Sequence, residues 1–441
     1  MSKIRIKNFG PIKEGLTDSK DGFVEINKLT VFIGDQGSGK STIAKLISTF
    51  LWLEKKLVRG DFTSSELDSK AFQSYLAYQQ IDDYLKDNSE IDFIGDRFVF
   101  EYKNKKLSVK ENKDSEYYRP KIMYVPSERI FCSAVNPFNV KDLPSYLASF
   151  VAEYKNAEEN LNNERFQLPL GDFYFRYDKN KKNAYISDGK KTYEIPLSHA
   201  SSGVQSVSPL ILVSNYLLND LSAKAKPGLE KYTVQENDDI KQTFYNVLKL
   251  GAVSAGSLVE GIVLSDPYLL AASCITALAT IGIKVMSKKD SKQEATDDNL
   301  VKELNKNLVS KINSCFVNVV EEPEQNLYPS SQKSVLLKLL ELMNGAKNNE
   351  LILTTHSPYV LGTINNSIYA GNLTKSGKAC DSVIAAKYQI PVKNVSAYKI
   401  ENGKIFNIVS KEIMQIENSE IDGCSDEINS DYEKLSDIEF A

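Results

Sequence analysis

Near its N-terminus the sequence reads Gly34-Asp35-Gln36-Gly37-Ser38-Gly39-Lys40-Ser41-Thr42, which fills every fixed position of the pattern G-x-x-x-x-G-K-[ST]. The apolar run 29–33 precedes this segment. Ile43, Leu46 and Ile47 follow it at helical spacing. We therefore expect a buried strand, a glycine-rich loop and a helix in that order, which is the context that the pattern requires.

The residue types in this loop suit the binding of phosphate groups. Glycines permit a tight turn whose backbone N–H groups point inward, and the helix that opens after Gly39 adds the positive end of its dipole. Lys40 is expected to reach the β- and γ-phosphates, and the Ser41 hydroxyl to hold Mg²⁺. A glycine-rich turn that merely joins a strand to a helix is the simpler alternative. The strand, the lysine and the serine together favour binding of a nucleoside triphosphate.

Composition places the chain among ordinary globular proteins. It has 441 residues, of which 25% are charged and 42% hydrophobic, so two or three domains or one interrupted domain are expected. The first residues enter a strand pattern directly, so we expect no signal peptide and a cytoplasmic protein. The five cysteines show no C-x-x-C spacing, which favours free thiols and no zinc site. They are Cys132, Cys274, Cys315, Cys380 and Cys424.

The net charge of -4 conceals an asymmetry between the tail and the rest of the chain. Residues 411–441 carry ten acidic side chains and two lysines, so the remainder is slightly basic. The overall charge therefore neither supports nor excludes a nucleic-acid partner. Ile428, Tyr432, Leu435 and Ile438 have helical spacing in the tail. This spacing is compatible with a docking helix, but also with a solvated chain end.

Another apolar run, residues 121–125, stops at Pro126-Ser127-Glu128-Arg129. Ligands of open α/β sheets lie at the carboxyl ends of strands, so this motif is a candidate ligand contact. A surface salt bridge between Glu128 and Arg129 explains the same residues equally well.

Two further apolar runs also end in side chains suited to nucleotide chemistry. Residues 315–320 lead into Glu321-Glu322, and residues 351–355 lead into His356. Paired carboxylates at a strand end are able to position Mg²⁺ and to polarise water. His356 is one of two histidines in the chain and is a candidate γ-phosphate sensor, although a lone histidine is more often structural.

A serine-rich segment, Ser201-Ser202-Gly203-Val204-Gln205-Ser206, precedes a strongly apolar helical pattern. Simple helix capping accounts for it, and a second anion-binding helix N-terminus does so as well. The sequence after this helix lacks a clear sheet pattern and is expected to be inserted. Its uncharged run 267–283 is short for a spanning helix, which favours a buried helix or an oligomer contact over a membrane anchor.

Taken together and in this order, the motifs resemble those of ABC-type ATPases of the SMC, RecF and OLD group. The loop 34–42 resembles Walker A, and Ser201 to Gln205 resembles the signature. The segment Glu321-Glu322-Pro323-Glu324-Gln325-Asn326-Leu327-Tyr328-Pro329 resembles Walker B with its D-loop, and Thr354-Thr355-His356-Ser357-Pro358 resembles the segment of the switch histidine. The motif at 124–129 stands where this group has its Q-loop. The resemblance covers residues 1–216 and about 311–400.

This resemblance implies an α/β ABC ATPase head, with a P-loop NTPase mixed sheet, a helical subdomain and an inserted, mainly helical region. The implied domains are 1–216 for the first lobe and signature, 217–312 for the insert, 313–400 for the second lobe and 401–441 for the acidic tail. Two such heads enclose two ATP molecules, each P-loop facing the signature of the other subunit. A homodimer or higher homo-oligomer that binds ATP and Mg²⁺ is therefore expected.

Carried over by position, the resemblance assigns roles to individual residues. Glu322 becomes the catalytic carboxylate, and His356 acts beside it. Ser41 and Glu321 become the metal-side residues. The nucleotide-binding residues are Gly34, Asp35, Gln36, Gly37, Ser38, Gly39, Lys40, Ser41, Thr42, Ser202 and Gly203. Two positions depart from the family pattern: Glu321 stands where aspartate is usual, and Val204 where a second glycine is usual.

Two functions follow from the resemblance. One is an ATPase that regulates a separate effector, a nuclease or toxin, in anti-phage defence, as in PARIS, Septu or retron-linked systems. About eighty residues follow His356 without an acidic Toprim constellation, which favours a separate effector. The other is a RecF-like repair ATPase that holds DNA through the lysine-rich turns 178–182 and 188–191. A third function, the nucleotide-binding domain of a transporter, agrees less well with the long insert between the signature-like and Walker B-like motifs.

Overall fold

The computed structural model describes residues 2–112, 117–134, 143–224, 314–410, 412–417, 430 and 433–435. The chain divides into two compact units, Met1–Lys224 with Ser310–Ala441, and Ala225–Val309. Every feature below belongs to the first unit. The expected helical insert 217–312 begins within a described helix that runs to Lys224, and the rest of it, with the apolar run 267–283, lies outside the described residues. Ile428, Tyr432 and Ile438 of the tail also lie outside them. No helix in the described part of the chain has the length and apolar character that crossing a bilayer requires.

A six-stranded sheet forms the centre of the first unit, in the order β15-β14-β3-β13-β12-β7. Its first five strands in chain order are parallel, and the last is antiparallel to its neighbour. Their bounds are β3 (Leu29–Ile33), β7 (Pro120–Val125), β12 (Cys315–Glu321), β13 (Glu350–Thr355), β14 (Val395–Glu401) and β15 (Lys404–Asn407). All residues of β3 and β12 are buried, because the sheet is covered on both faces. The predicted α/β fold class is confirmed.

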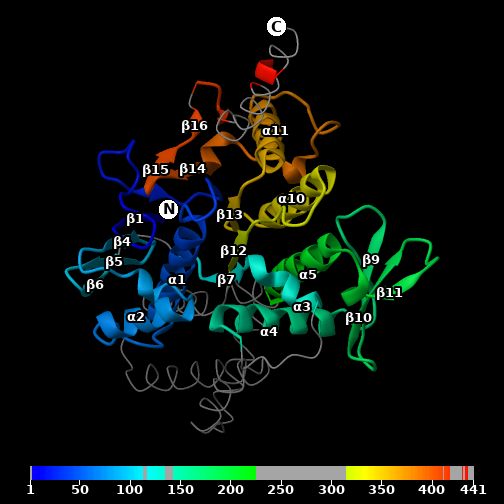
Figure 1. Ribbon diagram of the computed structural model, residues 1–441, viewed down its shortest axis with the longest axis horizontal. Helices are drawn as coiled ribbons and strands as arrows, with labels where there is room; N and C mark the ends of the chain where they lie inside the picture. Colours follow the sequence, from blue (N-terminus) through cyan, green and yellow to red (C-terminus); the bar gives the residue numbers. More distant parts are fainter. Residues whose placement is uncertain are drawn as a thin grey trace, which may run out of the picture. The chain divides into compact units, whose positions relative to one another are not determined.

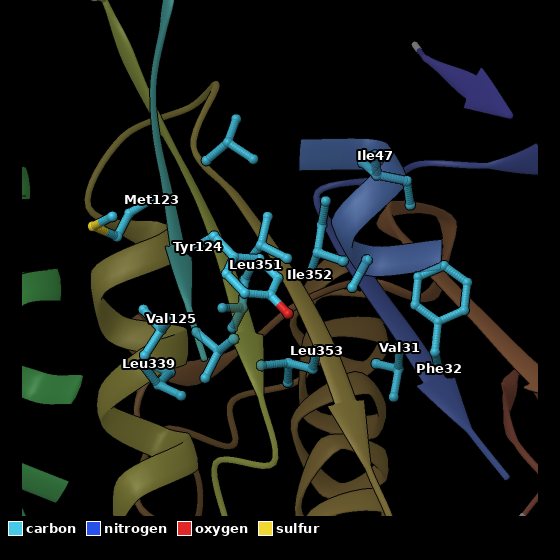
Figure 2. Close-up of a cluster of buried hydrophobic side chains, with 14 of the residues drawn as sticks. Val31, Phe32, Ile47, Met123, Tyr124, Val125, Leu339, Leu351, Ile352 and Leu353 are labelled. Carbon is cyan, nitrogen blue, oxygen red and sulfur yellow. The ribbon is translucent and has the colours of Figure 1, made fainter. Parts of the chain in front are cut away.

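Helices cover the sheet and bury its apolar runs. The helices in contact with the sheet are α1 (Lys40–Arg59), α4 (Ser145–Asn160), α5 (Ser202–Lys224) and α10 (Pro329–Asn344). The short helix α3 (Phe131–Ala134) contacts α5, and α11 (Pro358–Lys375) contacts α10. Figure 2 shows Ile47 of α1 and Leu339 of α10 flanking the strands that carry Leu353 and Val31. All four side chains are at most 1% exposed. Truncation of such a leucine to alanine typically costs about 2–5 kcal/mol, so this cluster fixes the sheet against its helices.

A second sheet is antiparallel and has the order β2-β1-β4-β5-β6. Its strands are β1 (Lys3–Lys7), β2 (Val24–Glu25), β4 (Glu90–Ile94), β5 (Phe98–Lys103) and β6 (Lys106–Glu111). It is joined to α1 by aromatic packing, because the Phe50 ring lies 5.1 Å from that of Phe93 and 5.4 Å from that of Phe100. The segment between this helix and β4 contains α2 (Ser69–Tyr78) and a short 3-10 turn at Asp82–Tyr84.

A four-stranded antiparallel sheet precedes α5 in the chain, and the lysine-rich turns 178–182 and 188–191 join its strands. Its strands are β8 (Arg165–Gln167), β9 (Phe173–Asp178), β10 (Asn183–Asp188) and β11 (Glu194–Pro196). A 3-10 turn, Leu197–His199, leads from it into α5. Other short elements are the 3-10 turns Ser127–Ile130, Ala386–Tyr388 and Val392–Asn394, and the strand pair β16 (Val409–Ser410) and β17 (Gln415–Ile416).

Parallel strand direction brings four sequence motifs to one edge of the central sheet. Strands β3, β13, β12 and β7 are neighbours in that order. Figure 1 labels β13, β12 and β7 of this row. The glycine loop follows β3, His356 follows β13, Glu322 follows β12, and the motif at 126–129 follows β7. The register aligns these strand ends, since Ile33 pairs with Thr355 and Thr354 pairs with Glu321. Segments more than 300 residues apart in the chain therefore meet at this edge.

Candidate functional site

The glycine loop between β3 and α1 has a backbone that requires its glycines. Gly34 has φ 142°, in a region that side chains disfavour. A Cβ atom at this position would lie 2.2 Å from the carbonyl oxygen of Ile400. The loop thus packs tightly against β14 on one side. Asp35, Gln36 and Gly37 are exposed, so the other side of the loop faces solvent.

Lys40 opens α1 and folds back over this loop. Its Nζ atom donates to the carbonyl oxygens of Gly34, at 2.9 Å, and Asp35, at 2.8 Å. Burial lowers the pKa of Lys40, while the carboxylates of Glu322 and Asp35 oppose that change. The ammonium group therefore has uncharged carbonyl partners in an acidic neighbourhood. Phosphate oxygens are stronger partners for it than these carbonyls.

Residues close to Lys40 in the sequence also carry hydroxyl groups. Ser41 is exposed at the start of α1, whereas Thr42 is buried. The Ser38 hydroxyl is buried and has no hydrogen-bond partner within the described structure. Gly39 precedes α1 with φ 114° and provides no side-chain cap, so the first N–H groups of the helix stay open to a ligand.

Glu321 ends β12 and is almost fully buried, at 3% exposure. Its Oε2 atom accepts from the backbone N–H of Ser127 at 3.2 Å. Its Oε1 atom has no hydrogen-bond partner among the described residues. A buried carboxylate oxygen without a donor is costly, which makes this atom suited to a cation.

Glu322 follows at once, in a backbone conformation that is unusual for a side-chain-bearing residue. Its φ is 42°, and its N–H donates to the carbonyl oxygen of Thr354 at 2.9 Å. Its Oε1 atom lies 3.3 Å from Nε2 of His356. The hydrogen bond from His356 is the main cause that lowers the pKa of Glu322, and Lys40 and Arg129 add to it. Glu322 therefore remains ionised at neutral pH.

Glu324 accepts hydrogen bonds that hold the backbone at His356 in place, a role that the sequence interpretation did not assign. One of its oxygens accepts from the Thr355 hydroxyl and from the N–H of His356, both at 2.7 Å. Burial raises the pKa of Glu324. Only its position two residues after Glu322 in the Walker B-like motif could have indicated this role.

The sequence interpretation gave Arg129 only as part of a candidate ligand contact or of a surface salt bridge with Glu128. The alternative of a surface salt bridge in this motif is wrong, because the Arg129 side chain is 0% exposed and donates to main-chain carbonyls. Glu128 is exposed and accepts instead from the Tyr146 hydroxyl at 3.1 Å. Burial lowers the pKa of Arg129 to about 10, and nearby carboxylates, Glu324 first, oppose this change.

The signature-like segment forms the first turn of α5, which begins at Ser202. Ser202 is exposed and Gly203 is buried. A Cβ atom at Gly203 would lie 2.8 Å from the carbonyl oxygen of Asn326, so glycine is needed for this close approach. Val204, which replaces a second glycine, is 5% exposed and joins the core, so the departure from the pattern serves packing.

The structure does not bring Ser202 and Gly203 to the glycine loop of the same chain. Helix α5 packs on β12 and β7. Strand β13 separates β12 from β3, which places the two motifs about 10 Å or more apart across the sheet. In the described structure no hydrogen bond joins Ser202 or Gly203 to residues 34–42. The other expected site residues do gather at one edge.

The residues at this edge fit a nucleoside triphosphate with Mg²⁺. Two buried oxygens, Ser38 Oγ and Glu321 Oε1, have no hydrogen-bond partner among the described residues, and the uncapped N-terminus of α1 suits an anion. Lys40 would hold phosphate oxygens, and Ser41 and Glu321 would hold the cation.

Comparisons with known proteins give one family and two similar structures. A family model described as an AAA ATPase domain matches residues 1–249. The SMC head domain from Thermotoga maritima is similar at 10% identity and a TM-score of 0.33, over 92% of this chain and 97% of that chain. An SMC head bound to the C-winged helix domain of ScpA is similar at 10% identity and a TM-score of 0.37, over 93% and 98%. No curated protein matches the sequence significantly.

Proposed function

The chain belongs to the AAA ATPase domain family and is an ATPase, and from this premise we propose that it hydrolyses ATP in a homodimer with composite sites. One observation carries this proposal. The ionised carboxylate of Glu322, its partner His356 and the phosphate-binding lysine Lys40 end or follow three adjacent strands. This spacing suits a base, its orienting group and a γ-phosphate.

In the proposed reaction each side chain has a separate task. Lys40 leaves the loop carbonyls and binds the β- and γ-phosphate oxygens. When bound, Mg²⁺ would neutralise the negative charge that develops on these oxygens. Glu322 orients a water molecule toward the γ-phosphorus and accepts its proton as the bond to ADP breaks. His356 keeps the carboxylate of Glu322 in place and ionised.

A second copy of the chain completes the site. Ser202 is exposed at the start of α5, but α5 lies on the β12–β7 side of its own sheet, away from the loop after β3. The N-terminus of a helix attracts anions. In a head-to-head dimer, Ser202 and Gly203 of one subunit therefore cap the γ-phosphate held by the other.

Light scattering with and without ATP tests this proposal. We expect Glu322→Gln to form an ATP-dependent dimer, because binding continues while hydrolysis stops. Ser202→Arg in the same background should remain monomeric and still bind ATP. A monomeric Glu322→Gln protein that binds ATP at saturating concentration would contradict the dimer.

We further propose that the head regulates a separate effector, a nuclease or toxin, in anti-phage defence, and that it works in the cytosol. The motif resemblance supports the first part. Free thiols at Cys132, Cys315 and Cys380 agree with the second. ATP-dependent co-purification with the product of the adjacent gene tests the regulatory role.

A repair ATPase that binds duplex DNA is the second candidate, and the exposed lysines after β9 and β10 favour it. Lys179 and Lys181 lie in the turn at 178–183, and Lys190 and Lys191 in the turn at 188–192. Binding through such lysines predicts ATPase stimulation by DNA that falls steeply with salt. Stimulation that is absent at low salt would remove this candidate.

A further inference from the structure

Arg129 links the end of β12 to helix α5 through hydrogen bonds to main-chain carbonyl oxygens. Its Nη1 atom donates to the carbonyl oxygen of Glu321 at 2.6 Å, and its Nη2 atom to that of Glu322 at 2.6 Å. Its Nε atom donates to the carbonyl oxygen of Ser206 in α5 at 3.3 Å. A fourth bond, 3.2 Å from Nη1 to the carbonyl oxygen of Pro126, holds the guanidinium to its own turn.

Only an arginine is able to make this set of bonds. The guanidinium carries five N–H donors in a rigid plane, whereas a lysine ammonium is a single point with three. The carbonyl oxygens of Glu321 and Ser206 belong to different elements, so a planar fork is needed to reach both. Burying a cation without a directly bonded carboxylate is costly, which argues against a residue retained for stability alone.

The backbone of Glu322 depends on this arginine. With φ at 42°, Glu322 occupies a region that few side-chain-bearing residues adopt, and such conformations persist when surrounding contacts hold them. Thr354 holds its N–H, and Arg129 holds its C=O. Arg129 thus fixes the direction in which the Glu322 carboxylate leaves the strand.

The same arginine fixes the first turn of α5. Ser206 lies four residues after Ser202, about one helical turn along the same face. A Cβ atom on Gly203, between them, would lie 2.8 Å from the carbonyl oxygen of Asn326, so the chain four residues after Glu322 packs closely on this turn. A shift of the chain at Glu322 is therefore transmitted to the start of α5 by a hydrogen bond and by a steric contact.

We propose that Arg129 is a positioning residue. It couples Glu322, in the ATP site of its own subunit, to the first turn of α5, which the same subunit contributes to the ATP site of the partner subunit. The proposal rests on the composite-site dimer of the proposed function. Arg129 has no hydrogen bond to residues 34–42 in the described structure, so it does not act by holding nucleotide. Loss of Arg129 should therefore weaken ATP-dependent dimerisation and leave ATP binding intact.

The test is Arg129→Lys in the Glu322→Gln background, which keeps the charge but not the planar fork. We expect ATP affinity within about threefold of the parent and at least a tenfold loss of ATP-dependent dimerisation, equal to about 1.4 kcal/mol. If Arg129 served Glu322 alone, the double variant would dimerise as well as Glu322→Gln, and the coupling would be refuted.

Ser133→Ala is the matched control, because the Ser133 hydroxyl donates to the carbonyl oxygen of Gln205 at 2.8 Å without touching Glu321 or Glu322. It removes a bond to the same helical turn and should leave ATP-dependent dimerisation unchanged within about twofold. An equal loss in Ser133→Ala would show that any bond to this turn matters and would overturn the role of Arg129. Failure of Glu322→Gln itself to dimerise would instead refute the proposed function.

A second measurement applies if Arg129→Lys does not fold. In the monomeric Ser202→Arg variant, ATP binds without a twin, so changes in hydrogen exchange report coupling within one chain. We expect ATP to slow amide exchange in both 126–130 and 204–208, on the same concentration dependence. Slowing confined to the glycine loop and 126–130 would overturn the proposal.

Discussion

The Nε2 atom of His356 lies 3.3 Å from the Oε1 atom of Glu322, although the two residues follow different strands of the sheet. Glu324 fixes the histidine from its backbone side, by accepting from the N–H of His356. The proposed base and its proposed orienting group are therefore held next to each other by residues of the chain itself.

Glu322→Gln should lower kcat by about a thousandfold, within the usual range for loss of a general base, while ATP affinity changes little. The amide keeps the size of the side chain but does not accept a proton from water. Steady-state turnover and equilibrium ATP binding measure the two effects. Glu341→Gln, on the surface of α10, is the control and should keep normal turnover. Wild-type turnover by Glu322→Gln would remove Glu322 from the reaction.

Lys40→Ala should abolish ATP binding, because the loop then lacks the cation that its glycines place beside the phosphates. Lys45→Ala in the same helix is a matched control. Its ammonium lies 4.5 Å from the centre of the Tyr146 ring and makes no bond to the loop. Calorimetry with Mg-ATP compares them. Equal affinity of Lys40→Ala and Lys45→Ala would contradict the assigned role of the loop.

Gly203→Ala should slow hydrolysis while sparing ATP binding by the single chain. The new methyl group meets the Asn326 carbonyl oxygen at 2.8 Å, and overpacking of this kind typically costs about 1–3 kcal/mol. Helix α5 is expected to move from Asn326 and to misplace Ser202. Gly362→Ala in α11 has nothing within 4 Å of the added atom and should be neutral or slightly stabilising. Unchanged turnover in Gly203→Ala would show that the close approach has no functional role.

Burial raises the pKa of Glu54 from an ordinary 4.5 to about 7, against the opposing N–H groups of Arg97 and Phe98. Because the folded-state pKa is the higher one, the contribution of Glu54 to stability is full below pH 4.5 and is lost as pH rises through 7. Glu54→Gln should therefore gain stability relative to wild type between pH 5 and pH 8, by at most about 3 kcal/mol. Urea unfolding at the two pH values measures it. A difference that is independent of pH would contradict the raised pKa.

Much of this edge of the sheet could be predicted from local sequence. The loop 34–42 is specified by its glycines and lysine, and the runs before Glu321 and His356 are apolar enough to require buried strands. Parallel strands then place their carboxyl ends together, so the meeting of the loop, Glu322 and His356 follows from three local patterns.

The roles of Arg129 and Glu324 could not be predicted in the same way. Arg129 bonds to carbonyl groups, which every residue has, so no side-chain pattern marks its partners.

The pairing of the first two strands could not be predicted either. They belong to a separate antiparallel sheet, in which Ile4 and Ile6 pair with β4, about 85 residues later in the chain. Short alternating runs do not specify which distant strand they join.

Inter-subunit cross-linking tests the composite site most directly. Gln36→Cys in the glycine loop and Ser202→Cys in α5 are both exposed positions, and they are combined in the Glu322→Gln background with a short bismaleimide. We predict a covalent dimer that forms with Mg-ATP, is absent without nucleotide, and does not form in either control that carries only one of the two added cysteines besides the native ones. A protein that binds ATP yet yields no ATP-dependent covalent dimer would contradict the account.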